Sequence, residues 1–103
     1  MQLLTKEIIK SLPRLYTTEN ENDPIVHIKF FDPTGRWTWY ATEGEERGDD
    51  FLFFGWVAGD CPELGYFTLN QLKTAKQGIK GLRAVPIERD TCFKPCRLSE
   101  VMK

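Results

Sequence analysis

The chain has 103 residues, of which 41% are hydrophobic and 28% are charged. These values predict one globular domain over residues 1–103, and no run approaches the roughly 18 apolar residues of a membrane span. The net charge of −1 is too small for a protein that mimics nucleic acid over its whole surface. The charged N-terminus lacks the apolar block of a signal peptide, so we expect a cytoplasmic protein.

The first third of the chain predicts a short helix and a β-hairpin. Thr5 is a suitable N-cap for a helix over residues 6–12, which Pro13 ends because the residue before a proline avoids the helical region. The β-branched and aromatic run at residues 25–31 predicts a strand. The turn sequence DPTG then leads into a second strand over residues 36–42.

The middle of the chain predicts two further strands and a second helix. The third strand covers residues 51–59, and a short fourth strand covers residues 65–67. Thr68 and Gln71 have the spacing of a capping box, in which each side chain satisfies the backbone N–H of the other residue. This pair therefore marks the start of the second helix.

The C-terminal part predicts less regular structure. Residues 82–90 are expected to add an edge segment, since Pro86 lacks the N–H that a central strand would donate. A last helical turn is expected at residues 99–102. The fold class predicted from this order is α+β, with an antiparallel three- to four-stranded meander sheet packed by two short helices.

The aromatic residues of the second and third strands allow two interpretations. Trp37 and Trp39 share one face of the second strand, and Tyr40 lies on the other face, because side chains alternate along a strand. The third strand is apolar on both faces, as in a strand covered on both sides or on one side by a partner. The aromatic residues therefore form either ordinary core or an exposed interaction surface.

The segment between these two strands is the most acidic in the chain and is predicted to be a turn over residues 43–50. Its simple interpretation is a solvated hairpin tip. Its functional interpretation is a contact whose carboxylates imitate phosphates and pair with Lys or Arg of a nucleic-acid enzyme. The candidate partner-binding residues are Glu43, Glu45, Glu46, Asp49, Asp50, Trp37, Trp39 and Tyr40.

Charge is distributed unevenly along the chain. Residues 19–63 contain eleven acids and three bases, whereas the remaining segments contain four acids and eleven bases. An acidic face would attract basic surfaces, and a basic region would favour nucleic acid. An alternative function is therefore nucleic-acid binding by the basic C-terminal third. The bases concerned are Lys76, Lys80, Arg83, Arg89, Lys94 and Arg97.

Residues suited to a metal site are few. A structural zinc site needs four ligands, usually from two close pairs. Cys61, Cys92, Cys96 and His27 do not provide that spacing. We therefore expect no metal or cofactor, and free thiols that serve as small apolar side chains in a reducing compartment.

Residues suited to catalysis are also few. Glu88 and Asp90 offer acid–base chemistry, so a small enzyme that uses this pair is a second alternative function. A structural salt bridge with the intervening Arg89 is the simpler interpretation. We expect a protein that is not an enzyme.

Three motifs resemble a bacterial family known as domain of unknown function 2958. They are LPRLYTTE at residues 12–19, IKFFDPTGRWTWYATE at residues 28–43 and ELGYFTLNQL at residues 63–72. The resemblance covers nearly the whole chain. The stretches AGDCP and CFKPC are less typical of the family, so it assigns no role to the cysteines.

The resemblance implies a genetic context rather than a chemistry. Similar proteins look like cargo of plasmids, conjugative elements and phages, and some resemble proposed inhibitors of type II CRISPR nucleases. The function expected from this likeness is an anti-CRISPR protein that binds a Cas9-type nuclease or its guide complex. The resemblance carries over no binding residues.

Overall fold

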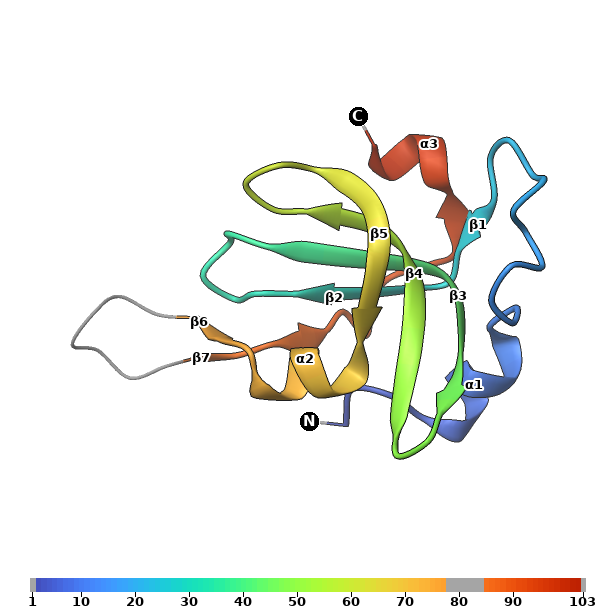
Figure 1. The fold of residues 1–103 in the computed structure, drawn as a ribbon. Coiled ribbons are helices and arrows are strands. Elements are labelled where there is room, and N and C mark those ends of the chain that lie inside the picture. The colour runs from blue at the N-terminus through green and yellow to red at the C-terminus, as the bar shows by residue number, and fades with distance from the viewer. Residues whose placement is uncertain (1, 78–84, 103) are drawn as a thin grey trace.

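The computed structural model describes residues 2–77 and 85–102, and a five-stranded antiparallel sheet forms the centre of this part of the chain (Figure 1). The strand order is β5-β4-β3-β2-β8, so four consecutive strands form the predicted meander. The α+β class is confirmed, and the predicted strand number is one short because β8 joins the edge beside β2. The strands are β2 (Ile28–Phe31), β3 (Thr38–Arg47), β4 (Asp50–Ala58), β5 (Glu63–Thr68) and β8 (Glu88–Arg89).

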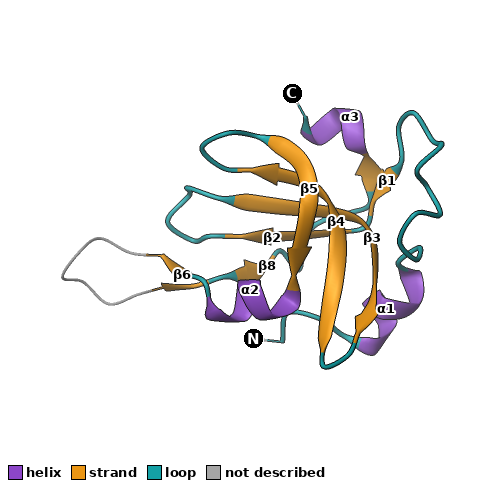
Figure 2. Cartoon of the chain, in the orientation of Figure 1, coloured by secondary structure: helices purple, strands orange, loops and turns teal. Residues whose placement is uncertain are grey.

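Short helices and two strand pairs surround this sheet (Figure 2). The predicted strand at residues 25–31 is divided at His27, whose backbone N–H donates to the carbonyl of Ala41 at 2.9 Å. Its first part, β1, pairs with β9 near the C-terminus. The remaining elements are α1 (Lys6–Ser11), α2 (Leu69–Thr74), α3 (Leu98–Val101), β1 (Ile25–Val26), β9 (Cys96–Arg97), β6 (Lys76–Gln77) and β7 (Val85–Pro86).

Local capping signals fix the starts of the first two helices. The Ile8 N–H donates to the Thr5 hydroxyl at 3.3 Å. At α2, the Gln71 N–H donates to the Thr68 hydroxyl at 3.1 Å, and the Thr68 N–H donates to the Gln71 side chain at 2.8 Å. Both caps are confirmed as predicted. None of the helices described is both long and apolar enough to cross a membrane.

Both of these helices pack on the same face of the sheet, here called the inner face. Phe30 and Phe53 are fully buried there, with ring centroids 5.4 Å apart, and Phe53 stacks on Phe67 at 5.1 Å. Leu12 from the end of α1 and Leu72 from α2 complete the same cluster. Burial of these side chains is the main source of stability for the fold.

A β-bulge at Thr42 changes which residues of β3 face inward. The register passes from Ala41 opposite Gly55 to Glu43 opposite Phe54, so Thr42 has no partner in the ladder. Its hydroxyl donates to the Phe54 carbonyl at 3.1 Å. An extra residue inverts the alternation of side chains beyond the bulge. Glu43 therefore lies on the face opposite the core, here called the outer face.

The predicted acidic turn is much shorter than expected. β3 continues through the acidic segment to Arg47, and β4 begins at Asp50. Only Gly48 and Asp49 remain as the hairpin turn, and Gly48 adopts a positive φ of 60°. The prediction of a turn over residues 43–50 was wrong because the pairing of β3 with β4 continues past the bulge, as far as Arg47 opposite Asp50.

Candidate functional site

The outer face of the sheet carries a continuous row of large apolar side chains. Tyr40 on β3, Phe54 and Trp56 on β4, and Leu64 and Tyr66 on β5 lie beside one another in the strand register. Leu64 is 45% exposed and Tyr66 is 51% exposed. The Phe54 and Tyr66 rings meet edge to face at 4.9 Å. The apolar residues of β4 are therefore divided between the core, on one face of the sheet, and this row on the other face.

The two neighbouring tryptophans do not belong to this surface. Trp39 is 8% exposed within the core. Trp37 stacks on it, with ring centroids 5.9 Å apart, and remains half-buried. Gly59 leaves room for Trp37, because a Cβ at that position would lie 2.2 Å from the indole. Of the three predicted aromatic contacts, only Tyr40 lies on the outer face.

Glu43 is buried, although it was predicted to lie in a solvated turn. Its side chain is 4% exposed. One carboxylate oxygen accepts the Tyr16 N–H at 2.8 Å, and the other accepts the Thr18 N–H at 2.7 Å and a short hydrogen bond from the Thr18 hydroxyl. A buried carboxylate needs such donors. Glu43 therefore fastens the loop of residues 13–24 to the outer face.

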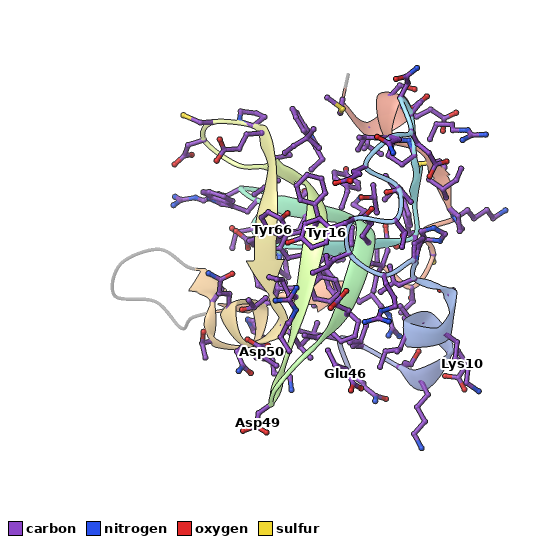
Figure 3. All side chains as sticks on the ribbon, turned by 45° about the vertical axis from the view of Figure 1, so that its right-hand side comes forward. Lys10, Tyr16, Glu46, Asp49, Asp50 and Tyr66 are labelled. Carbon is purple, nitrogen blue, oxygen red and sulfur yellow. The ribbon has the colours of Figure 1, made fainter. Side chains whose placement is uncertain are left out.

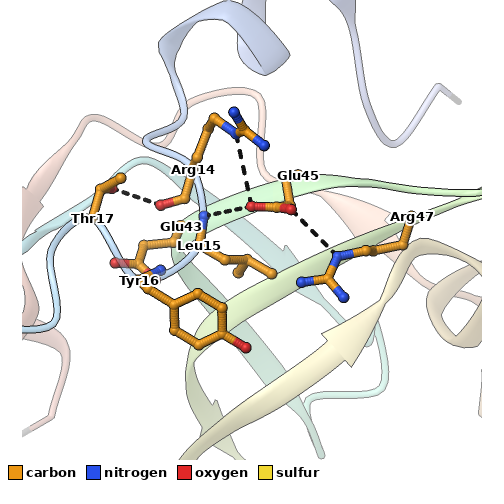
Figure 4. A network of polar contacts seen from close by, with 7 residues as sticks. All are labelled: Arg14, Leu15, Tyr16, Thr17, Glu43, Glu45 and Arg47. Atoms are coloured by element: carbon orange, nitrogen blue, oxygen red, sulfur yellow. Dashed lines mark hydrogen bonds and ion pairs between the residues drawn. The ribbon is translucent and has the colours of Figure 1, made fainter.

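Glu45 supports the same loop one step further along β3 (Figure 4). Its carboxylate accepts the Leu15 N–H at 3.1 Å. It also forms ion pairs with Arg14 at 3.9 Å and Arg47 at 3.3 Å. Two of the five predicted acids are thus engaged in holding the loop.

The other three acids lie around the hairpin tip (Figure 3). The Asp50 carboxylate accepts the Phe51 N–H at 2.8 Å and the Asn70 N–H at 3.0 Å, so it ties the tip to α2. Burial raises the pKa of Asp50, but the hydrogen bonds from Asn70 and Phe51 outweigh it and lower the pKa below its ordinary value of 3.8. Glu46 and Asp49 remain exposed. Glu43 and Glu45 therefore lie against the loop of residues 13–24, whereas the other three acids lie around the hairpin tip.

A cleft of about 330 Å³ lies between the loop of residues 13–24 and the outer face. Tyr16 and Tyr66 line it and lie close together (Figure 3). Tyr16 has a φ of 71°, which is uncommon for a residue with a side chain. The lining consists of Tyr16, Thr18, Glu19, Glu21, Asn22, Pro24, Thr42, Glu43, Phe54, Leu64, Tyr66 and Leu98.

A family model described as "Protein of unknown function (DUF2958)" matches residues 3–103. The chain belongs to this family. The family resemblance expected from the sequence is confirmed, and the description assigns no activity. The comparisons with curated proteins and with solved structures gave no match.

The three DUF2958-like motifs converge on the cleft. The first contributes Tyr16 and Glu19, the second ends with Glu43, and the third contributes Leu64 and Tyr66. Strand and loop assignments alone did not identify the tyrosines or Glu19 as site residues. The sequence signal that included them was the set of family motifs, because Tyr16 and Glu19 lie in the first motif and Tyr66 lies in the third.

One member of the predicted catalytic pair of the DUF2958 chain, Asp90, is engaged in other contacts. The Asp90 carboxylate pairs with Lys29 at 3.5 Å and accepts the Cys92 N–H at 2.9 Å. Asp90 lines a shallow pocket with His27, but Glu88 is not part of that lining. Burial lowers the pKa of His27 below its ordinary value of 6.5. The arrangement resembles a structural ion pair more than a paired acid and base.

The basic C-terminal third is described only in part. Lys80 and Arg83 lie outside the described residues, and the side chain of Lys76 is likewise not described. Lys94 and Arg97 are exposed, and Arg97 donates to the Asp23 carbonyl at 3.1 Å. These positions leave nucleic-acid binding as an alternative.

The cysteines are free thiols, as predicted, but two of them are not packed as small apolar side chains. Cys61 and Cys92 are exposed, and Cys96 is half-buried. Burial raises the pKa of the Cys96 thiol, and Glu100 adds to this effect. Within residues 2–77 and 85–102, no group of three or more His, Cys, Asp or Glu side chains is arranged to hold a metal ion.

Proposed function

We propose that this DUF2958 protein acts without catalysis, by binding another protein through the outer face of its sheet. The observation that carries the proposal is the exposed row of apolar side chains on β4 and β5. α1 and α2 both pack on the inner face, so neither covers this row. Contiguous apolar surface of this kind marks interaction sites, and buried tyrosine and tryptophan are the usual anchors of protein interfaces.

The partner that the family resemblance suggests is a Cas9-type nuclease or its guide complex. Such nucleases hold nucleic acid in a positively charged channel. Glu19 and Glu21 lie on the lining of the cleft, while Glu46 and Asp49 are exposed at the hairpin tip. These carboxylates would approach the basic groups of the nuclease and guide association. The protein would then act in the cytoplasm of a bacterial host, as cargo of a mobile element.

The test is a DNA-cleavage titration with purified Cas9 orthologues. The wild-type protein should reduce cleavage at near-stoichiometric ratio with at least one orthologue. The double variant Leu64→Ser/Tyr66→Ala should require at least tenfold more protein for the same inhibition. The reason is that truncation of an anchor residue at an interface often costs about 2 kcal/mol or more of binding free energy. Met102→Ala removes an exposed apolar side chain outside the cleft lining and serves as the matched control.

Two results would count against the proposal. The absence of inhibition at large molar excess across orthologues would reject the nuclease as target. Inhibition lost in Lys94→Glu/Arg97→Glu but retained in Leu64→Ser/Tyr66→Ala would favour the nucleic-acid alternative. That alternative also requires a gel shift that weakens steeply with salt.

A further inference from the structure

The cleft beside the outer face has aromatic walls. Tyr16 from the loop and Tyr66 from β5 both line it, and Phe54 from β4 meets Tyr66 edge to face at 4.9 Å. The faces of such rings carry negative partial charge and attract cations that approach within about 6 Å. A cavity of about 330 Å³ is large enough for a single long side chain but not for a folded element.

The charged groups of this cleft all have one sign. Glu19, Glu21 and Glu43 contribute carboxylates to the lining, which contains no Lys or Arg. The hydrogen-bond donors to the buried Glu43 are two backbone N–H groups and one hydroxyl, so they satisfy its oxygens without neutralising its charge.

The nearby carboxylates also act on the Tyr66 hydroxyl, although they are not the main cause of its raised pKa. The pKa of Tyr66 is raised, first by its hydrogen bond with Tyr16, then by burial and by the nearby Tyr16, Glu43 and Glu19. An added positive charge would offset the negative charge of these carboxylates. The cleft is therefore complementary to a cation that also has apolar surface.

We propose that the cleft binds one arginine side chain of a partner protein, with the guanidinium between the tyrosine rings and the glutamates. A guanidinium stacks on aromatic rings and pairs with carboxylates in a planar, bidentate arrangement, and its methylene stem can lie along Leu64. Lysine lacks the planar group that both contacts use. The arginine would belong to the protein that the outer face binds, so this site rests on the proposed function.

The loop conformation is consistent with a preformed site. The backbone of Tyr16 has a left-handed conformation, which is unfavourable in free energy for a residue with a side chain. The hydrogen bond from its N–H to Glu43 stabilises this conformation. Because Glu43 is occupied in this way, Glu19 and Glu21 are the acids left to pair with the guanidinium. Glu43 acts as a positioning residue that also supplies charge.

The test uses short blocked peptides and the full chain, without any nuclease. Acetyl-Gly-Arg-Gly-amide is titrated at low salt while backbone amide NMR shifts are followed, alongside the same peptide with Gln or Lys in place of Arg. The arginine peptide should give saturable shifts at residues 16–21 and 64–66. The Lys peptide should bind several-fold more weakly, and the Gln peptide should not saturate.

Variants then assign the contacts. Tyr66→Ala and Glu19→Gln should each weaken arginine-peptide binding about three- to tenfold, the range that one cation–π contact or one partly exposed ion pair supports. Glu7→Gln removes an exposed acid outside the cleft lining and should leave binding unchanged. If Tyr66→Ala does not fold, Tyr66→Phe with Glu19→Gln replaces it, and binding should fall through the loss of the acid.

Equal response to the Arg and Gln peptides would overturn the site, and equal affinity for Lys would overturn its assignment to a guanidinium. Saturable arginine binding without nuclease inhibition would reject the proposed target and leave this site standing. Nuclease inhibition that persists in Tyr66→Ala and Glu19→Gln, with no peptide binding by the wild type, would reject this site and leave the proposed function.

Discussion

Phe53 and Phe54 are neighbours in β4 but belong to opposite faces of the sheet. Phe53 is fully buried against Phe30 and Phe67, whereas Phe54 is half-buried beside the exposed Tyr66. The inner face is closed by apolar packing of two helices. The outer face is covered only in part, by a loop that carboxylates hold through its backbone. The burial of apolar surface stabilises the inner face, whereas hydrogen bonds between the loop backbone and carboxylates fix the position of the loop on the outer face.

Separate truncation of the two phenylalanines should give the largest difference in stability between the two faces. Phe53→Ala should lower the free energy of unfolding by about 3–5 kcal/mol, the cost of a large cavity in a packed core. Phe54→Ala should cost about 1 kcal/mol, because less of its ring leaves water on folding. Urea unfolding followed by tryptophan fluorescence gives both values. Similar losses would mean that the outer face is also core.

Two glycines opposite each other in the ladder give the next largest effect. A Cβ at Gly55 would lie 1.7 Å from the Tyr40 carbonyl oxygen, while a Cβ at Gly65 would meet nothing within 4 Å. Gly55→Ala should cost about 2–3 kcal/mol, because backbone must move. Gly65→Ala should change stability by less than about 0.5 kcal/mol. Thermal unfolding would contradict this account if the two variants were equally stable.

Removal of the carboxylate that holds the loop should reduce the free energy of unfolding by a smaller amount, but should strongly increase hydrogen exchange in the loop. Glu43→Ala leaves the Tyr16 and Thr18 N–H groups without their acceptor, so we expect a loss of about 2 kcal/mol. Amide hydrogen exchange at residues 15–18 should become much faster, while exchange in β4 is affected less. Glu46→Ala, at an exposed acid of the same strand, is the control and should leave both measurements unchanged.

The smallest effect is expected where α3 meets the end of the loop. Hydrogen bonds from the Ser99 N–H and hydroxyl lower the pKa of Asp23 below its ordinary value of 3.8. A carboxyl whose folded pKa is lowered contributes stability above its unfolded pKa, and loses it as pH falls through the folded value. Asp23→Asn should therefore lower the melting temperature slightly at pH 7 but not at pH 2. An equal difference at both pH values would contradict this assignment.

The features that the sequence alone predicted correctly depend on neighbouring residues. Thr5, Thr68 and Gln71 define their helix caps through partners three residues away, and the DPTG turn closes with the Gly35 N–H on the Asp32 carbonyl at 2.8 Å. The apolar character of both faces of β4 was also evident. Such short-range interactions form with little loss of chain entropy, so local residue types suffice to specify them.

The tertiary structure decided the features that join distant segments. The bulge at Thr42 depends on the register with β4, and it alone moves Glu43 to the outer face. Glu43 then meets Tyr16, 27 residues earlier in the chain, and the cleft exists only because the loop is held there. β8 joins the sheet beside β2 in the same way. A one-residue shift in pairing reverses which face a side chain occupies, and sequence periodicity does not record that shift.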